Sequence, residues 1–380
     1  MDDLELHRPL IGQQGSRAAL NTPVLVLDVE AMERNIAKMA ALAAGRSVAL
    51  RPHAKTHKSV DIAHRQIAAG AVGVCCAKIG EAEVMVDGGV GGVLVTSPVA
   101  APAAIVRLAA LAARAKGLMA VVDHPDVARA IDAALGEVGA TLDVLIDVDP
   151  GIRRTGVASV EAAVALAETI AGCAQLRLRG VQFYCGVQQH LEGYQQRAAA
   201  ITERTNYLRG VIAALKASGF SCPIISGGGT GTHHIDMTLG VFTELQVGSY
   251  VLMDRQYLDC ALTPDDPAPF EVALAVDSRV VSANHDALVT IDAGFKSLST
   301  DGGAASVRDG AAAGAAFAFM GDEHAALIAP GIGTALRPGD RVTLTVPHCD
   351  PTVNLYDHYH VVRGGTLVDI WPVSARGRAR

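Results

Sequence analysis

The sequence is poor in aromatic residues, which make up only 4% of the chain and include a single tryptophan. Half of the 380 residues are nevertheless hydrophobic, so the interior must be built mainly from aliphatic and small side chains. Basic residues are also scarce relative to acidic ones, 32 against 39, which gives a net charge of -7. Because nucleic-acid binders need basic surfaces, we expect no nucleic-acid partner.

Long hydrophobic runs and a cysteine framework are missing as well. The most apolar region, residues 99–122, is interrupted by Arg107, Arg114 and Lys116, so we expect no membrane span. The first residues, Met1-Asp2-Asp3, lack the basic and then apolar segments of a secretory signal. The seven cysteines are an odd number without regular spacing, which predicts reduced thiols in a cytoplasmic protein.

Short apolar runs recur at regular intervals between residues 47 and 252, and alanine-rich helical patterns follow most of them. Such runs are typical of strands buried on both faces. Eight strands alternating with helices predict a (β/α)8 barrel, with an open doubly wound sheet as the alternative because periodicity does not show closure. We expect strands at 47–53, 72–76, 92–97, 118–123, 142–149, 176–184, 223–228 and 244–252, and helices near 57–69, 79–88, 100–116, 125–136, 158–171 and 192–218.

The helical pattern ends after about residue 255, and a linker-like stretch at 265–269 follows it. Alternating segments separated by Gly, Asp and Pro then predict an antiparallel β domain, with a loop at 302–314. We expect a strand at 22–28 to pair into this domain, and residues 1–21 to be irregular. The predicted domains are therefore a barrel over 30–255 and a β domain made of 1–29 and 256–380.

The segment from Arg51 to Lys58 lies at the end of the first barrel strand and contains two histidines and two lysines. Active residues of barrels gather at the C-terminal ends of the strands. A lysine in that position can lose water, lower its pKa and act as an amine nucleophile. We therefore predict that Lys55 holds an aldehyde cofactor, although a solvated basic turn is the alternative.

Glycine-rich segments follow the seventh and eighth strands, where barrels commonly bind phosphate. The run Gly227–Gly231 presents several backbone N–H groups with little side-chain bulk, beside Thr230 and Thr232. A tight turn that requires positive φ is the alternative. Together with Lys55, a phosphate site at this rim predicts pyridoxal 5'-phosphate. The candidate cofactor-binding residues on these two segments are Gly228, Gly229, Thr230, Gly248, Ser249 and Tyr250.

Arg154 and Tyr184 end the fifth and sixth predicted strands. Arg154 is a candidate to face the pyridine nitrogen of the cofactor, and Tyr184 to pack on or hydrogen-bond its ring. A surface ion pair is the alternative for Arg154.

A second cluster, His348-Cys349-Asp350, lies far away in sequence. If this segment is extended, His348 and Asp350 project to the same side. An imidazole nitrogen and a carboxylate oxygen then suit Mn²⁺ or Mg²⁺, with waters completing the shell. A ligating Cys349 would favour zinc instead, and a hydrogen-bonded His–Asp pair in a turn is the structural alternative. His358 and His360 are expected at the surface.

Together, these residues resemble the fold-type III pyridoxal-phosphate enzymes of the D-threonine aldolase and 3-hydroxy-D-aspartate aldolase group, with D-serine dehydratase as a relative. The matching segments run in order along nearly the whole chain. They are Thr22-Pro23, Arg51–Lys58, Val74-Cys75-Cys76, Arg154–Val157, Tyr184 with Gln189-His190, Gly227–Gly231, Glu244–Tyr250, Asp322-Glu323-His324, His348–Thr352 and Trp371–Gly377.

The resemblance implies an alanine-racemase-like barrel with a β domain, usually in a homodimer. It implies Lys55 as the Schiff-base lysine, and His53 at the same strand end is a further candidate cofactor-binding residue. It also implies phosphate binding by Thr230, Gly248 and Ser249, and metal ligation by His348 and Asp350. One departure is Ala77, because relatives often carry glutamine there, close to the cofactor. Asp350, where dehydratases place cysteine, and His57, where they tend to carry serine, favour the aldolase branch.

The expected function is a pyridoxal-phosphate- and metal-dependent aldolase that cleaves β-hydroxy-D-amino acids of the D-threonine type to glycine and an aldehyde. The candidates that move the proton are His190, His57, His53 and a metal-bound water. The alternatives are cleavage of 3-hydroxy-D-aspartate to glycine and glyoxylate, and dehydration of D-serine or D-3-hydroxyaspartate. A non-catalytic pyridoxal-phosphate carrier is a third possibility, but such carriers lack the C-terminal β domain.

Overall fold

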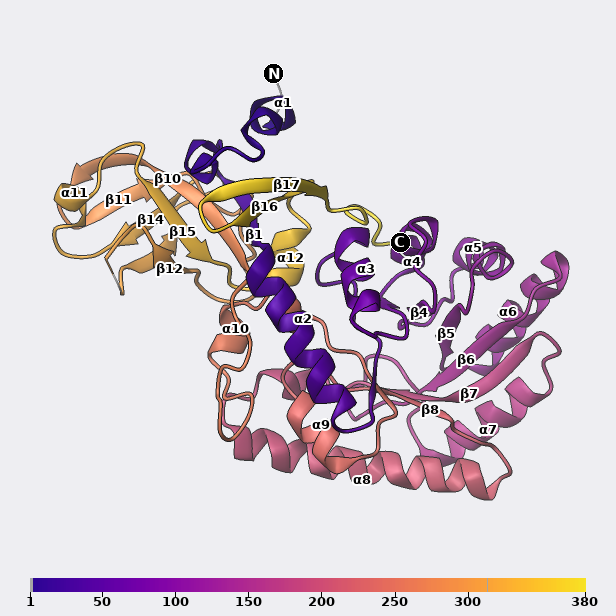
Figure 1. The fold of residues 1–380 in the computed structure, drawn as a ribbon. Helices are drawn as coiled ribbons and strands as arrows, with labels where there is room; N and C mark the ends of the chain where they lie inside the picture. Colours follow the sequence, from indigo (N-terminus) through magenta and orange to yellow (C-terminus); the bar gives the residue numbers. More distant parts are fainter. Residues whose placement is uncertain (1–2, 313) are drawn as a thin grey trace.

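The computed structural model describes residues 3–312 and 314–380, and this part of the chain forms two sheets (Figure 1). The eight-stranded sheet is parallel throughout and has the order β2-β9-β8-β7-β6-β5-β4-β3. A parallel bridge between His53 and Cys75 joins its first and last strands, and the Ala54 amide donates to the Cys75 carbonyl at 2.7 Å. The predicted barrel is therefore confirmed. Its strands are β2 Ala49–Leu50, β3 Cys75–Cys76, β4 Leu94–Val95, β5 Met119–Val122, β6 Leu142–Asp147, β7 Leu176–Phe183, β8 Ile224–Gly227 and β9 Glu244–Leu245.

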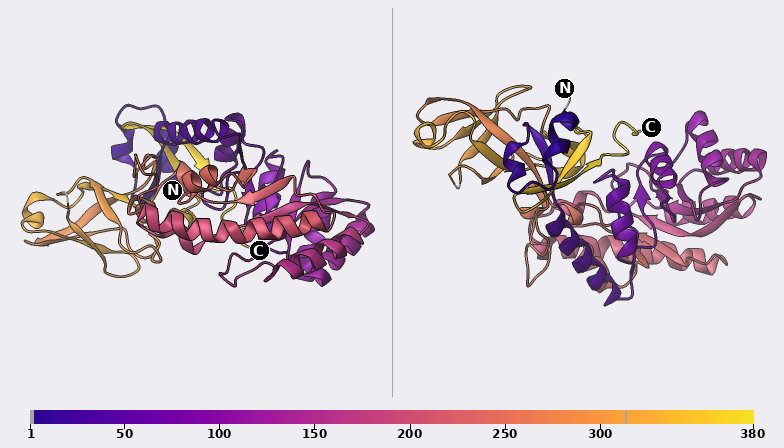
Figure 2. Two further views of the ribbon diagram at one scale, coloured as in Figure 1. Left: turned by 90° about the horizontal axis from the view of Figure 1, so that it is seen from below. Right: turned by 45° about the horizontal axis from the view of Figure 1, so that its top comes forward.

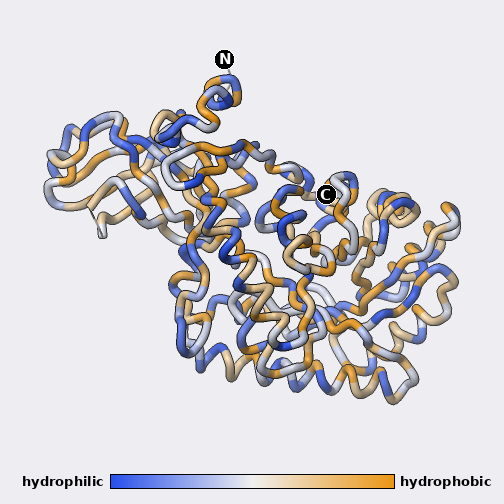
Figure 3. The backbone as a smooth tube through the Cα atoms, in the orientation of Figure 1, coloured by the Kyte–Doolittle hydropathy of each residue, from blue (hydrophilic) through white to orange (hydrophobic). Residues whose placement is uncertain are grey.

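Helices surround the barrel on its outer face. The first of them begins where the Asp28 carboxylate accepts the amides of Glu30 and Ala31, as an N-cap does. The longest, α8, buries residues such as Ile201 and Leu208 and exposes polar ones, so hydrophobic and hydrophilic residues mix along it in Figure 3. The helices are α2 Val29–Ala44, α3 Val60–Ala68, α4 Ile79–Asp87, α5 Pro102–Ala112, α6 Pro125–Val138, α7 Val160–Ala171, α8 Tyr194–Ala217 and α9 His233–Leu239.

The second sheet has nine strands and lies beside the barrel in Figures 1 and 2. Its strand β1, Val24–Asp28, pairs antiparallel with β10 and parallel with β16, so the N-terminal strand joins the C-terminal sheet as predicted. The chain then ends in a tail that reaches α4, where the Arg378 and Arg380 carbonyls lie against Gly80. The other strands are β10 Leu274–His285, β11 Leu288–Ile291, β12 Ser306–Asp309, β13 Ala316–Phe319, β14 Ala325–Ile328, β15 Arg341–Thr345, β16 His358–Arg363 and β17 Thr366–Pro372.

Short helical segments connect these elements, and none of the helices in the described residues is long and apolar enough to cross a membrane. The segments are α1 Asp3–His7, η1 Arg8–Leu10, η2 Ser16–Ala19, η3 Val187–His190, η4 Ser249–Val251, α10 Arg255–Leu258, α11 Ile332–Ala335 and α12 Cys349–Val353.

Four local expectations are wrong. The N-terminal residues expected to be irregular contain α1 and two 3-10 turns, and the expected loop at 302–314 contains β12, which pairs with β15. The eighth strand stops at Leu245, and the backbone turns at Gly248 into η4. His360 is buried and not a surface residue, because its ring lies against that of His7 with their nitrogens 2.7 Å apart.

Candidate active site

A cavity of about 380 Å³ opens where the barrel strands end. Segments that follow seven of the eight barrel strands, all except β5, contribute to its lining, as expected for a site at the C-terminal rim of a barrel. The structure thus brings together most of the predicted cofactor-binding residues. Those that line the cavity are His53, Lys55, Arg154, Tyr184, Gly229, Thr230, Gly248 and Ser249.

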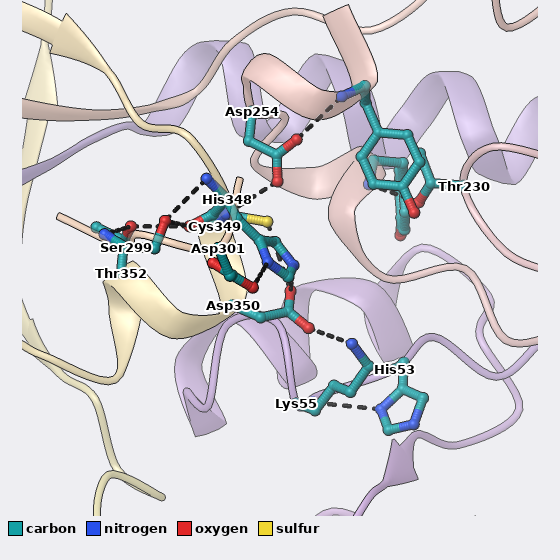
Figure 4. Close-up of polar contacts among 12 residues, drawn as sticks. His53, Lys55, Thr230, Asp254, Ser299, Asp301, His348, Cys349, Asp350 and Thr352 are labelled. Atoms are coloured by element: carbon teal, nitrogen blue, oxygen red, sulfur yellow. Dashed lines mark hydrogen bonds and ion pairs between the residues drawn. The ribbon is translucent and has the colours of Figure 1, made fainter. Parts of the chain in front are cut away.

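Lys55 lies in a turn directly after β2, and its ammonium donates to Asp350 Oδ2 (Figure 4). Burial alone would lower the pKa of Lys55, but Asp350 outweighs it and raises that pKa above its usual value. Burial would likewise raise the pKa of Asp350, but Lys55 and then His348 hold it well below its usual range. The lysine and the carboxylate are therefore both charged, and each stabilises the other.

The segment around His348 is not extended as the sequence predicted. His348 precedes α12, so Asp350 lies in the first turn of a helix. The two side chains still face each other, with His348 Nε2 4.0 Å from Asp350 Oδ1. Cys349 between them is fully buried, and burial raises the pKa of its thiol well above the usual value.

Residues that the sequence reasoning missed hold His348 in place. Its Nδ1 lies 2.8 Å from Asp301 Oδ2, which leaves Nε2 to face Asp350 (Figure 4). Ser299 Oγ accepts the His348 amide and donates to the His348 carbonyl, both at 3.1 Å. Metal-binding histidines are commonly oriented by a carboxylate on the second ring nitrogen. The only sequence signal for Asp301 is its place before Gly302-Gly303, in a region read as a loop.

Asp254 connects the barrel to this cluster. Its buried carboxylate accepts the Cys349 amide at 2.8 Å and the Tyr257 amide at 3.1 Å, and burial raises its pKa. The start of α12 is thereby fixed relative to the barrel rim. No group of three or more His, Cys, Asp or Glu side chains in residues 3–312 and 314–380 could hold a metal ion. His348 and Asp350 fit a divalent cation by donor chemistry, and waters or substrate would have to complete its shell.

The two glycine-rich segments present unpaired backbone amides at the cavity. The amides of Thr230, Gly248 and Ser249 have no hydrogen-bond partner within the described part of the chain, although all three residues line the cavity. A Cβ at Gly248 would lie 2.6 Å from Thr56 Oγ1, so only glycine fits there. Unpaired amides in one cavity suit a phosphate. These residues fit the phosphate of pyridoxal phosphate.

Arg154 follows β6 and Tyr184 follows β7, two neighbouring strands of the barrel. The Arg154 guanidinium carbon is 5.7 Å from the centre of the Tyr184 ring, within reach of a cation–π contact. Ala77 also lines the cavity, and its amide donates to buried Glu81, which pairs with Lys58.

The histidines near the site differ in access. His57 and Tyr250, predicted to be catalytic and cofactor-binding, are buried outside the cavity lining, and His57 Nδ1 accepts the Ser59 amide. Burial lowers the pKa of His57 to about 4 and that of His53 to about 3.

His190 is exposed, and its ring lies 4.6 Å from that of Tyr257, a lining residue. Partial burial, followed by His348 and Lys55, lowers its pKa to about 4, so its imidazole is neutral at pH 7.

Comparison with known families agrees with this geometry. Residues 27–256 match the family described as alanine racemase, N-terminal domain, and residues 273–362 match a putative serine dehydratase domain. The chain therefore belongs to the alanine-racemase-like barrel family, in the branch that carries this second domain.

Individual proteins of this family are similar to the chain over nearly its whole length. The chain is 36% identical to the 3-hydroxy-D-aspartate aldolase of Paracoccus denitrificans strain Pd 1222, over 94% of this chain and 93% of that protein. It is 37% identical to the D-threonine aldolase of an Arthrobacter species, over 96% and 94% of the two chains. The crystal structure of D-threonine aldolase from Filomicrobium marinum superimposes with a TM-score of 0.91 at 39% identity, and covers 96% of this chain and 97% of that one.

Proposed function

We propose that the chain is a pyridoxal-phosphate- and divalent-metal-dependent aldolase that cleaves β-hydroxy-D-amino acids of the D-threonine type into glycine and an aldehyde. The observation that carries the proposal is the single cavity that Lys55 shares with the free amides of Thr230, Gly248 and Ser249. Full-length similarity to two kinds of aldolase supports the carbon–carbon lyase class.

Different residues at the rim would bind different parts of the cofactor. Lys55 would bind its aldehyde carbon, and the three free amides would bind its phosphate. Arg154 and Tyr184, with His53 on the first strand end, would contact its ring. Pyridoxal phosphate supplies an electron sink that stabilises the negative charge left at the substrate Cα when the Cα–Cβ bond breaks.

His348 and Asp350 would hold a divalent cation, with Mn²⁺ or Mg²⁺ favoured by the nitrogen and carboxylate donors. Such a cation supplies a Lewis acid that lowers the pKa of the β-hydroxyl group. Asp301 and Ser299 orient His348 for this role. The position of these residues next to Lys55 would place the β-hydroxyl of the substrate on the domain boundary.

His190 is the histidine best placed to take the proton from the β-hydroxyl oxygen. It is neutral at pH 7 because its pKa is lowered to about 4, and it is exposed beside a residue that lines the cavity. His57 is buried among protein groups, which favours a part in holding the Lys55 turn: the Tyr359 hydroxyl donates to its carbonyl at 2.6 Å.

Two alternative functions are also supported by specific observations. Cleavage of 3-hydroxy-D-aspartate to glycine and glyoxylate would use the same groups, and the similarity to an enzyme of that name favours it. The alternative of a dehydratase is supported by the match of residues 273–362 to a putative serine dehydratase domain. We also propose a homodimer in the cytoplasm, and the seven free cysteines agree with a reducing compartment.

Reconstitution tests the cofactor and the metal separately. Protein freed of both should gain a visible absorbance band with pyridoxal phosphate, and should cleave D-threonine only after Mn²⁺ is added. Turnover in the presence of a strong chelator would overturn the metal assignment. Failure to develop the band would overturn the cofactor assignment.

A further inference from the structure

Gln189, in the 3-10 turn η3, packs against the glycine-rich loop Gly227–Gly231. A Cβ at Gly231 would lie 2.0 Å from the Gln189 carbonyl oxygen, and one at Gly229 would lie 2.5 Å from Gln189 Oε1. The backbone of Gln189 leaves no room for a methyl group at Gly231, and a methyl group at Gly229 would require the end of the Gln189 side chain to move. Gly231 is therefore required because η3 lies against the loop, independently of how closely a phosphate approaches.

The Gln189 side chain also fixes the loop through hydrogen bonds. It is completely buried, and its Oε1 accepts the Gly231 amide at 3.0 Å. Its Nε2 donates to Thr232 Oγ1 at 3.1 Å and to the Cys185 carbonyl at 3.3 Å. Because an amide N–H can only donate, the contact with Gly231 determines which end of the glutamine faces the loop.

Thr232 extends this support to a second amide of the loop. Its hydroxyl accepts the Gly229 amide at 3.2 Å and donates to Asp236 Oδ2 at 2.6 Å. Both Thr232 and Asp236 are buried. The amides of Gly229 and Gly231 are thus satisfied by protein groups, whereas the Thr230 amide between them has no partner among residues 3–312 and 314–380 and lies at the cavity.

The same glutamine precedes the candidate base. His190 is the last residue of η3, and the ring of His190 packs on Tyr257 at the rim. We propose that Gln189 is a positioning residue that joins the phosphate-binding loop to the turn carrying His190, so that one buried side chain sets the geometry of both. This inference rests on the proposed function, in which the loop binds the cofactor phosphate and His190 takes the proton.

Replacing Gln189 by leucine tests the coupling. The Gln189→Leu variant should bind pyridoxal phosphate roughly tenfold or more weakly, because it loses two hydrogen bonds that hold the loop. Its kcat should also remain reduced at saturating cofactor, because His190 is displaced. Val187→Ala, at an exposed position of the same turn, should change neither value. A Gln189→Leu protein with a lower Tm but unchanged cofactor affinity and kcat would overturn the proposal.

Thr232 provides a second test if the leucine variant does not fold. Thr232→Val removes the hydroxyl that accepts the Gly229 amide and should weaken cofactor binding, while Thr232→Ser retains the hydroxyl and should restore it. Equal cofactor affinity of the valine and serine variants would contradict the proposal. If the wild-type chain itself binds no pyridoxal phosphate, the proposed function fails, and that outcome is distinct from a failure of the coupling alone.

Discussion

The Lys55 ammonium forms an ion pair with Asp350 across the boundary between the barrel and the β domain, and the two residues are 295 positions apart in sequence. Without the cofactor, Lys55 therefore contacts one oxygen of the carboxylate that would bind the metal. Binding of the cofactor aldehyde by Lys55 would release Asp350. If Lys55 holds the cofactor and Asp350 the metal, as proposed, the ion pair would link assembly of the two parts of the site.

Asp350→Asn should accelerate incorporation of pyridoxal phosphate at neutral pH. Asp350 raises the pKa of Lys55, and only the unprotonated amine attacks an aldehyde, so removing the carboxylate charge enlarges the reactive fraction. Stopped-flow measurement of the visible band from pH 6 to 9 checks this, and Asp357→Asn, an exposed carboxylate of the same domain, is the control. Identical rates for wild type and Asp350→Asn would show that the ion pair does not govern the lysine.

Lys55→Ala should abolish the visible band of the bound cofactor, because the amine that holds its aldehyde is gone. Lys78 lines the same cavity but is exposed, so Lys78→Ala should keep the band. Absorbance spectra after removal of free cofactor distinguish the two. A band that persists in Lys55→Ala would mean that another residue holds the cofactor.

Asp301→Ala should weaken Mn²⁺ binding by about 10- to 100-fold, because His348 loses the carboxylate that orients its ring. The cofactor band should be unaffected. Calorimetric titration of the cofactor-loaded protein with Mn²⁺ measures the change, and Asp322→Ala, an exposed carboxylate in the same domain, is the control. Unchanged affinity in Asp301→Ala would remove His348 from the metal site or Asp301 from its support.

Asp236→Asn should change how stability depends on pH. Burial raises the pKa of Asp236 to about 7 from 3.8, so between these values the folded chain binds the proton more tightly than the unfolded chain. Stability of the wild type should therefore fall as pH rises through this window, by an amount on the order of a few kcal/mol. Urea unfolding of the cofactor-free proteins at pH 5 and pH 8 should show a smaller decrease for Asp236→Asn; equal decreases would contradict the assignment.

The sequence predicted the parts of the fold that local patterns encode. Apolar runs located all eight barrel strands, and their order placed Lys55 and Gly229 on one rim, where the structure has them. The Lys55–Asp350 ion pair could not be predicted from the sequence, because its two residues come from different domains and no periodicity relates them.

The remaining differences have similar causes. His348-x-Asp350 has the spacing of one strand face, but buried Asp254 accepts the Cys349 amide and the backbone turns into a helix there. Helix α9 was missed because it has only seven residues and follows the glycine run directly. The contribution of Asp301 depends on the tertiary position of a loop, which the sequence pattern does not specify.

The central claim is that this site breaks a Cα–Cβ bond. Protein loaded with pyridoxal phosphate and Mn²⁺ should be incubated with D-threonine and, separately, with D-3-hydroxyaspartate, and the products quantified. The account predicts glycine in amounts equal to the aldehyde, acetaldehyde or glyoxylate, without ammonia. Ammonia and a keto acid in place of glycine would contradict it and would identify the chain as a dehydratase.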